Sequence, residues 1–208
     1  MDMIENLMTA AIKAYKDGDY AKGLSIRDLL LDAQPTDPAL IDDIDLLAAM
    51  CCLERGMVGA MRTVLALAKE PEPVRHPFAL QLVQAISEAP GNVPERFDLM
   101  AYAGGLISPA LVADRAQYHS LQGDMYKNRW GEHYLALEHY GAADMLFQRA
   151  GDFAGELRNK LKLIRTTLVI GEAAFTASLF LEAEALAMRV DDEDLREQLS
   201  NLSLLHAA

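Results

Sequence analysis

The chain has 208 residues, of which 51% are hydrophobic and 24% are charged. These proportions are typical of a folded globular protein and exclude a disordered one. Its formal net charge is −12, which repels phosphate backbones and anionic lipid surfaces and so argues against nucleic acid or membrane as a partner. The longest unbroken apolar run, 46–53, is too short to span a bilayer, and the acidic N-terminus does not resemble a secretory signal. We therefore expect a cytoplasmic protein with no membrane insertion.

Helical periodicity begins at the N-terminus. Apolar residues recur at spacings of three and four from Ile4 to Tyr15, which indicates one face of an amphipathic helix. The pattern stops at the turn signal 17–19 and resumes over 20–33, and Pro35 and Pro38 then end the second helix. This first segment is predicted to form a helical hairpin.

The hairpin pattern recurs along the chain. A glycine separates two helical stretches five times, at intervals of 38, 35, 40 and 40 residues, at Gly18, Gly56, Gly91, Gly131 and Gly171. Twelve residues after each glycine stand Leu30, Ala68, Ala103, Ala143 and Ala183. Nine residues after each stand Arg27, Leu65, Met100, Tyr140 and Phe180. Small and large residues at fixed helical offsets are what closely packed antiparallel helices require, so the period predicts about five hairpins.

Two local features interrupt this regularity. Five of the eight prolines lie within 71–94, which predicts an irregular joint inside a single helical domain spanning 1–208. The only two cysteines, Cys51 and Cys52, are adjacent, and a disulfide between neighbours is strained. We interpret them as reduced core side chains, with a redox role as the alternative.

Three of the five units resemble a known repeat. One stretch resembles the second half of a tetratricopeptide repeat. It begins with Gly18, Asp19 and Tyr20 and continues to Leu30 and Pro35. The units around Gly131 and Gly171 are similar to it, with an aromatic residue and an alanine at the offsets given above. Membership of this family would imply an all-α fold, a right-handed superhelix of about five antiparallel hairpins. It would also imply a binding role, because the first helix of each hairpin in the family lines a concave groove.

The resemblance also places candidate groove residues. Carried over residue by residue, it implies that the fourth and fifth units contribute Tyr118, Gln122, Met125, Arg129, Arg158, Lys162 and Arg165. Arg158, Lys162 and Arg165 lie at i, i+4 and i+7 and share one helical face. We interpret this face as a basic wall for a carboxylate or an acidic peptide segment. The alternative is an exposed helix face whose bases balance acids on a neighbouring helix.

The search for catalytic chemistry gives no candidate. Gly104-Gly105 lacks the Lys-Ser/Thr step of a phosphate-binding loop, and His133 and His139, six residues apart, do not share a helical face. We therefore expect no enzyme activity, no cofactor and no metal site, and we interpret the histidines as surface or inter-helix residues.

Three functional hypotheses follow. The leading one is a protein–protein interaction scaffold that binds a partner peptide in its groove. The second is a regulatory repeat protein that senses a ligand or peptide and changes curvature on binding. A hydrolytic or metal enzyme is the third, and no motif in the sequence supports it.

Overall fold

The computed structural model describes residues 3–33, 35–67 and 76–207. Within these ranges it contains eleven α-helices, one π-helical segment and no strand, which confirms the all-helical prediction. The chain divides into two compact units, Met1–Ala110 and Leu111–Ala208. None of the helices in these ranges combines the length and the apolar composition that a membrane crossing requires.

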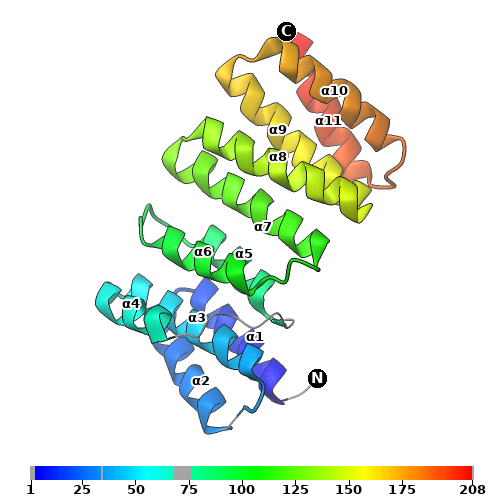
Figure 1. Cartoon of the computed structure of the whole chain (residues 1–208). Helices are drawn as coiled ribbons and strands as arrows, with labels where there is room; N and C mark the ends of the chain where they lie inside the picture. The colour runs from blue at the N-terminus through cyan, green and yellow to red at the C-terminus, as the bar shows by residue number, and fades with distance from the viewer. Residues whose placement is uncertain (1–2, 34, 68–75, 208) are drawn as a thin grey trace. The chain divides into compact units, whose positions relative to one another are not determined.

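The first unit holds six helices (Figure 1), namely α1 (Met3–Lys16), α2 (Tyr20–Asp32), α3 (Pro38–Glu54), α4 (Val58–Leu67), α5 (Ala79–Glu88) and α6 (Arg96–Leu106). The second unit holds α7 (Val112–Met125), the π-helical segment η1 (Tyr126–Trp130), α8 (His133–Ala150), α9 (Phe153–Ile170), α10 (Ala173–Ala187) and α11 (Glu193–Ala207). Successive helices pair into hairpins, α1 with α2, α3 with α4, α5 with α6, α7 with α8 and α9 with α10.

The turns of these hairpins lie where the sequence period places them. The backbone φ is positive, between 68° and 80°, at each of the five periodic glycines. A side chain would strain the backbone there, so glycine is the residue that ends the first helix and lets the chain reverse. The glycine period is therefore a period of tight turns.

Aspartates start several of the helices. The side chains of Asp19, Asp37, Asp152 and Asp192 each accept a hydrogen bond from a backbone N–H in the first turn that follows, at 2.9–3.1 Å. Such a cap satisfies one of the N–H groups that have no partner within the helix, and it is worth about 1 kcal/mol. Asp192 belongs to the acidic run 191–194, which lies at the N-terminus of α11.

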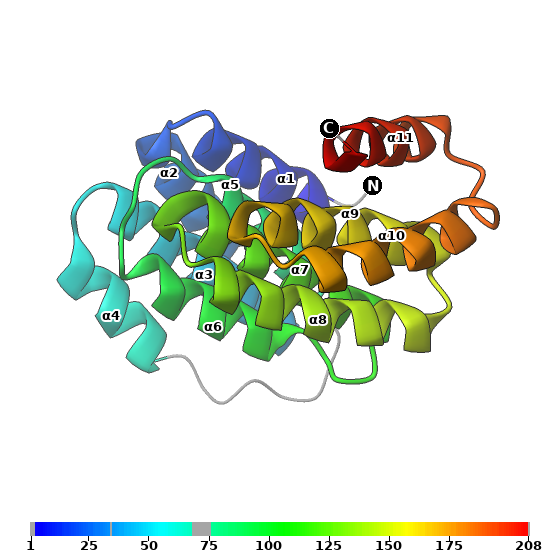
Figure 2. The ribbon, with the colours of Figure 1, turned by 90° about the horizontal axis from the view of Figure 1, so that it is seen from above.

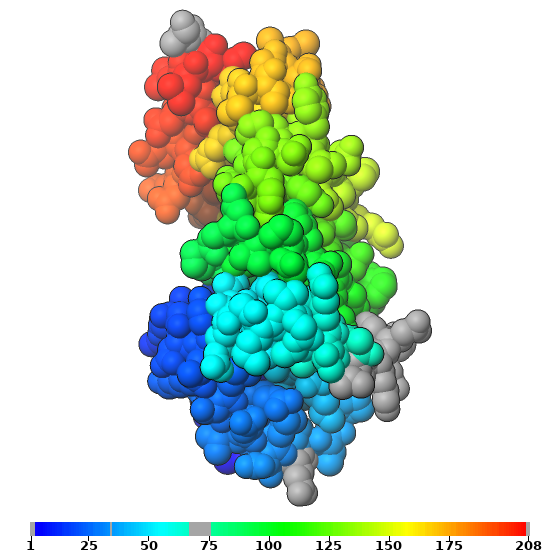
Figure 3. All heavy atoms as spheres, turned by 90° about the vertical axis from the view of Figure 1, so that its left-hand side faces the viewer, coloured from blue at the N-terminus to red at the C-terminus, as the bar shows by residue number. Residues whose placement is uncertain are grey.

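Helix α3 is the centre of the first unit. It contacts α1, α2, α4, α5 and α6, and most of its side chains are buried. That position explains the apolar run 46–53, and it places both cysteine thiols in the core, free of any disulfide. Burial raises the pKa of Cys51 to about 12, so its thiol stays protonated and unreactive. Helix α4, in contrast, has Met61 as its one buried residue among 58–66 and lies on the surface of the unit (Figure 3).

A buried arginine connects α6 to α3. Arg96 is fully buried, and its Nη2 lies 2.7 Å from Oε1 of Glu54. The same guanidinium donates hydrogen bonds to the backbone carbonyls of residues 89, 90 and 91. The hydroxyl of Tyr15 in α1 donates to the same Glu54 oxygen at 3.0 Å. The turn before α6 is therefore fixed by charge-assisted bonds.

In the second unit, α8 contacts both α7 and α9 (Figures 1 and 2). The predicted core positions Tyr140 and Ala143 are fully buried. In the next hairpin, Ala183 is fully buried and Phe180 is nearly so. Helix α11 packs on α9 and α10 through Leu195, Leu199 and Leu202. In the second unit, the small and large residues at these offsets thus lie at helix–helix contacts, whereas Ala68 of the first unit lies outside the described ranges.

The predicted proline-rich joint is only partly described. Residues 71–75 lie outside the described ranges, and Ala79–Glu88, inside the predicted joint, form the regular helix α5. The division into compact units falls later, between Ala110 and Leu111, just after Pro109.

Candidate peptide-binding site

The basic face predicted on α9 points away from its buried side. Leu157, Leu161 and Ile164 fill the core of the second unit, while Arg158, Lys162 and Arg165 lie on the other face of the same helix. The three basic side chains line one cavity of about 320 Å³ together with residues of α11. The structure therefore brings these three predicted site residues together.

The second wall of this cavity comes from α11 and from the residue just before it. Asp192, Asp194, Leu195 and Gln198 face the bases of α9 across it. These residues were not among the predicted site residues, because the family resemblance covers the hairpins and not the helix that follows them. The alternative interpretation, in which neighbouring acids balance the bases, applies in part, since two of these residues are carboxylates.

The two arginines differ from the lysine in their partners. Arg158 has a 58% exposed side chain, and its Nη2 lies 4.0 Å from Oδ2 of Asp192, at the limit of an ion pair. Nη2 of Arg165 donates to the neutral Oε1 of Gln198 at 2.8 Å. Within the described part of the chain, no carboxylate oxygen lies within 4 Å of Arg165. Within the described residues, Arg165 thus makes no direct ion pair, although Asp192 and Asp194 line the same cavity.

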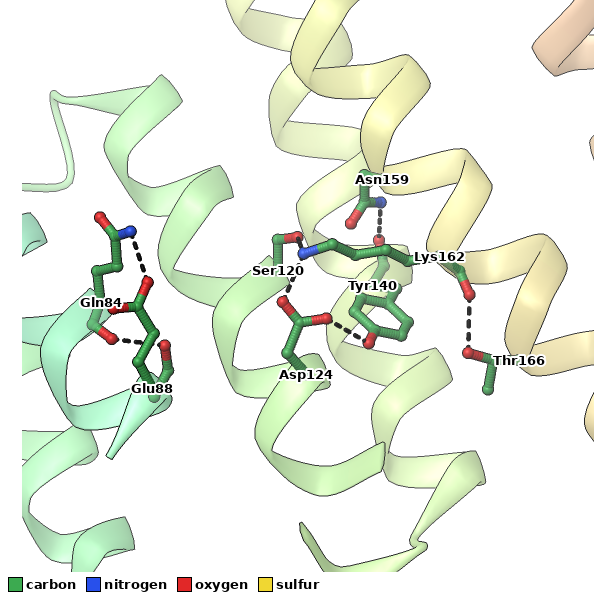
Figure 4. Close-up of polar contacts among 9 residues, drawn as sticks. Gln84, Glu88, Ser120, Asp124, Tyr140, Asn159, Lys162 and Thr166 are labelled. Atoms are coloured by element: carbon green, nitrogen blue, oxygen red, sulfur yellow. Dashed lines mark hydrogen bonds and ion pairs between the residues drawn. The ribbon is translucent and has the colours of Figure 1, made fainter. Parts of the chain in front are cut away.

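Lys162 is held by the neighbouring helices (Figure 4). Its Nζ donates to Oδ2 of Asp124 at 2.6 Å and to the hydroxyl of Ser120 at 2.9 Å, both in α7. The hydroxyl of Tyr140 in α8 donates to the other oxygen of Asp124 at 2.8 Å. Because its hydrogen bonds are already made inside the protein, Lys162 contributes to positioning α9 more than to capturing a ligand.

Further positive charge lies close to Arg165. Burial, together with the charges of Arg165 and Lys162, lowers the pKa of Lys127 in η1, and the charge of Asp124 opposes that shift. Burial is the largest of these effects, and the effects of Arg165, Lys162 and Asp124 show only that these three charged groups lie near Lys127.

The predicted site residues of α7 and η1 lie elsewhere. Tyr118 and Met125 are buried, with 6% and 1% of their surface exposed, so they pack in the interior and offer little contact area to a peptide. Gln122 and Arg129 are half-buried. The structure therefore does not assemble all seven predicted residues on one surface, because the inward face of α7 is covered by its own neighbours.

In the described ranges, no group of three or more His, Cys, Asp and Glu side chains is placed to hold a metal ion. Several polar atoms are nevertheless buried without a hydrogen-bond partner, among them Oε1 of Gln122.

Comparison with protein-family models, with curated proteins and with solved structures finds no match to this chain.

Proposed function

We propose that this protein is an interaction scaffold whose hairpins stack as a tetratricopeptide-like right-handed superhelix and whose first helices line a groove for a partner peptide. The positive-φ glycines at the hairpin turns and the pairing of successive helices support this proposal. Each hairpin is too small to bury its own apolar face, so stacking on neighbours is the physical reason for the repeat.

One observation carries the binding role. Arg165 opens into a cavity of about 320 Å³, beside Arg158, with no carboxylate of the described chain within 4 Å. A guanidinium presents paired N–H donors that match a carboxylate in a bidentate manner. The ligand that completes this site is a peptide segment with an acidic side chain or a terminal carboxylate.

The acids of α11 do not prevent such binding. The contact of Arg158 with Asp192 is long and exposed, and ion pairs of this kind are worth about 0–1 kcal/mol. A hydrogen bond to a charged group inside a partly enclosed cavity is worth about 1.5–3 kcal/mol. A ligand carboxylate can therefore displace Asp192 and bind both arginines.

The test is charge reversal of the two arginines that face the cavity. We expect the double variant Arg158→Glu and Arg165→Glu to lose binding to acidic peptides selected on the unaltered protein, measured by titration calorimetry at two salt concentrations. Lys162 stays unchanged, because its reversal would break the contact with Asp124. Lys13 and Arg149 are exposed and outside the cavity, so reversing both gives a control with the same change in net charge.

The expected control result is binding close to that of the unaltered protein. If both double variants bind the peptide equally well, the site is not on the face of α9. Small-angle scattering with and without the peptide separates the scaffold from the regulatory alternative, since a sensor changes its radius of gyration on binding and a scaffold does not.

A further inference from the structure

The cavity on the second unit has two walls of opposite charge. Helix α9 contributes the bases Arg158, Lys162 and Arg165. The opposite wall contributes the acids Asp192 and Asp194, of which the second lies in the first turn of α11. A ligand in this cavity therefore meets bases on one side and acids on the other.

A bound carboxylate would change the balance between these walls. Arg158 and Asp192 offset each other in part, with Nη2 and Oδ2 4.0 Å apart. In the proposed function, a ligand carboxylate takes the place of Asp192 at this guanidinium. Asp192 would then lose its only ion-pair contact in the described chain, and the ligand would bring a second negative charge beside it. Like charges at such distances repel, so a purely acidic ligand loses part of what it gains from the arginines.

Asp194 strengthens this effect. Its side chain is exposed. In the described ranges, no basic nitrogen lies within 4 Å of its carboxylate. Arg158 contacts Asp192 instead, and Arg196 contacts Asp191 and two backbone carbonyls. The acidic wall thus holds one carboxylate without a close base and a second that loses its base when a ligand binds.

The size and the apolar part of the cavity limit what can enter. Its volume of about 320 Å³ is near the lower end of ligand pockets, which span roughly 300–1,000 Å³. Leu161 and Leu195 also line it, and both are buried. Their methyl groups can pack against the methylene groups of a long charged side chain. The cavity therefore suits a pair of side chains from a partner segment, and not the whole segment.

The charge of the whole chain favours the same kind of ligand. The formal net charge is −12, so a partner segment with many acids is repelled as it approaches. A segment with equal numbers of acids and bases is not repelled in this way. The charge near the cavity and the charge of the chain thus both disfavour a polyacidic partner.

We propose that the partner segment carries a basic side chain close to its carboxylate, so that the carboxylate binds the arginines of α9 and the base binds Asp192 and Asp194. This inference rests on the proposed function, because it states the charge pattern of the ligand at that site. The long contact between Arg158 and Asp192 is exchanged for two ion pairs with the partner. In an extended segment, side chains two residues apart lie on the same face, which places an acid and a base side by side.

The test compares three capped synthetic peptides that differ at one position. Each contains one glutamate in an uncharged alanine sequence, and the residue two positions later is lysine, glutamine or a second glutamate. We expect the lysine peptide to bind about three- to fivefold more tightly than the glutamine peptide at low salt, as an exposed ion pair allows. The peptide with two glutamates should bind most weakly. Binding is followed by nuclear magnetic resonance of the arginine side chains, which detects even millimolar affinities.

Two pairs of substitutions within 191–194 identify the acids that matter. Asp192→Asn with Asp194→Asn removes both carboxylates of the wall and keeps a side-chain oxygen to cap α11 at the N–H of Leu195. In this variant the preference for the lysine peptide should disappear. Asp191→Asn with Glu193→Gln removes the same charge from exposed residues that do not line the cavity, so this matched control should keep the preference.

Failure of this inference differs from failure of the proposed function. The inference is overturned, and the acid-binding site stands, if the glutamine peptide binds as tightly as the lysine peptide. It is also overturned if the wall variant keeps the preference or if the control variant loses it. If none of the three peptides binds, or if Arg158→Glu with Arg165→Glu binds them as the unaltered protein does, the proposed function fails and this inference fails with it.

Discussion

The ammonium of Lys162 lies 2.6 Å from Oδ2 of Asp124, and Tyr140 donates a hydrogen bond to the other oxygen of the same carboxylate. One carboxylate in α7 therefore connects α8 and α9. Burial and the charge of Asp124 raise the pKa of Tyr140, so its hydroxyl stays protonated and continues to donate at physiological pH. Three helices of the second unit are held in register by this network.

The network predicts a measurable coupling. Lys162→Met should lower the free energy of unfolding of the second unit by about 1–2 kcal/mol, because the partners are only about a quarter exposed and the bond is charge-assisted. Asp124→Asn should cost a similar amount. A double-mutant cycle by urea denaturation should give a coupling energy of at least about 0.5 kcal/mol, and strictly additive effects would contradict the contact.

Arg96 in the first unit should be far more sensitive to substitution. Arg96→Ala removes the fully buried guanidinium, which is the counter-ion of Glu54 and the donor to three backbone carbonyls. Breaking a buried pair in this way costs about 3–5 kcal/mol. The control is Arg62→Ala, since Arg62 is 66% exposed and lies 4.0 Å from Glu95. Denaturation midpoints should fall strongly for the first variant and hardly for the second.

Asp43 predicts an unusual dependence of stability on pH. Burial raises the pKa of its carboxyl to about 7, and the hydrogen bond that it accepts from the N–H of Phe78 opposes the shift only in part. The pKa of the Asp43 carboxyl is higher in the folded chain than in the unfolded chain. The contribution of Asp43 to stability is therefore fully present below pH about 4 and is lost as the pH rises through about 7. The first unit should lose about 2–3 kcal/mol from this residue between pH 5 and pH 8.

The comparison that isolates this effect is Asp43→Asn. The amide keeps an acceptor for Phe78 and cannot ionise, so the variant should gain stability relative to the unaltered protein as the pH rises from 5 to 8. Thermal melting across this range measures the difference. A difference that stays constant with pH would mean that Asp43 is ionised throughout.

Two glycines in the α7–α8 hairpin predict opposite effects of the same substitution. A Cβ at Gly123 would clash with the buried ring of Tyr140, so Gly123→Ala should displace that ring and cost about 1–3 kcal/mol. A Cβ at Gly141 meets nothing within 4 Å, so Gly141→Ala should stabilise the helix by about 0.5–1 kcal/mol. Equal effects in urea denaturation would show that α7 and α8 do not approach as closely as the structure has them.

The glycine period was readable from the sequence because it depends on local backbone chemistry. A residue at positive φ is most easily a glycine, and Gly18 and Gly171 mark turns whichever helices pack around them. Helix starts are local in the same way, since Asp192 needs only the next backbone N–H groups to cap α11. All-helical composition and hairpin turns therefore follow from short-range rules.

The partners of the charged residues do not follow from such rules. Arg158, Lys162 and Arg165 share one helical face in the sequence, yet Lys162 is bound by Asp124, 38 residues away, and Arg165 meets Gln198. His119 and His139 are 20 residues apart and meet only because α7 and α8 pack as a hairpin.

Periodicity by itself determined the helices, their turns and the side of α9 that stays out of the core, because these depend on neighbours within four residues. Which base is neutralised, which arginine meets an amide oxygen and which two imidazoles meet was decided only by tertiary packing. Contacts of this kind depend on distances of 3–4 Å between residues that are remote in the chain, and a helical period does not encode those distances.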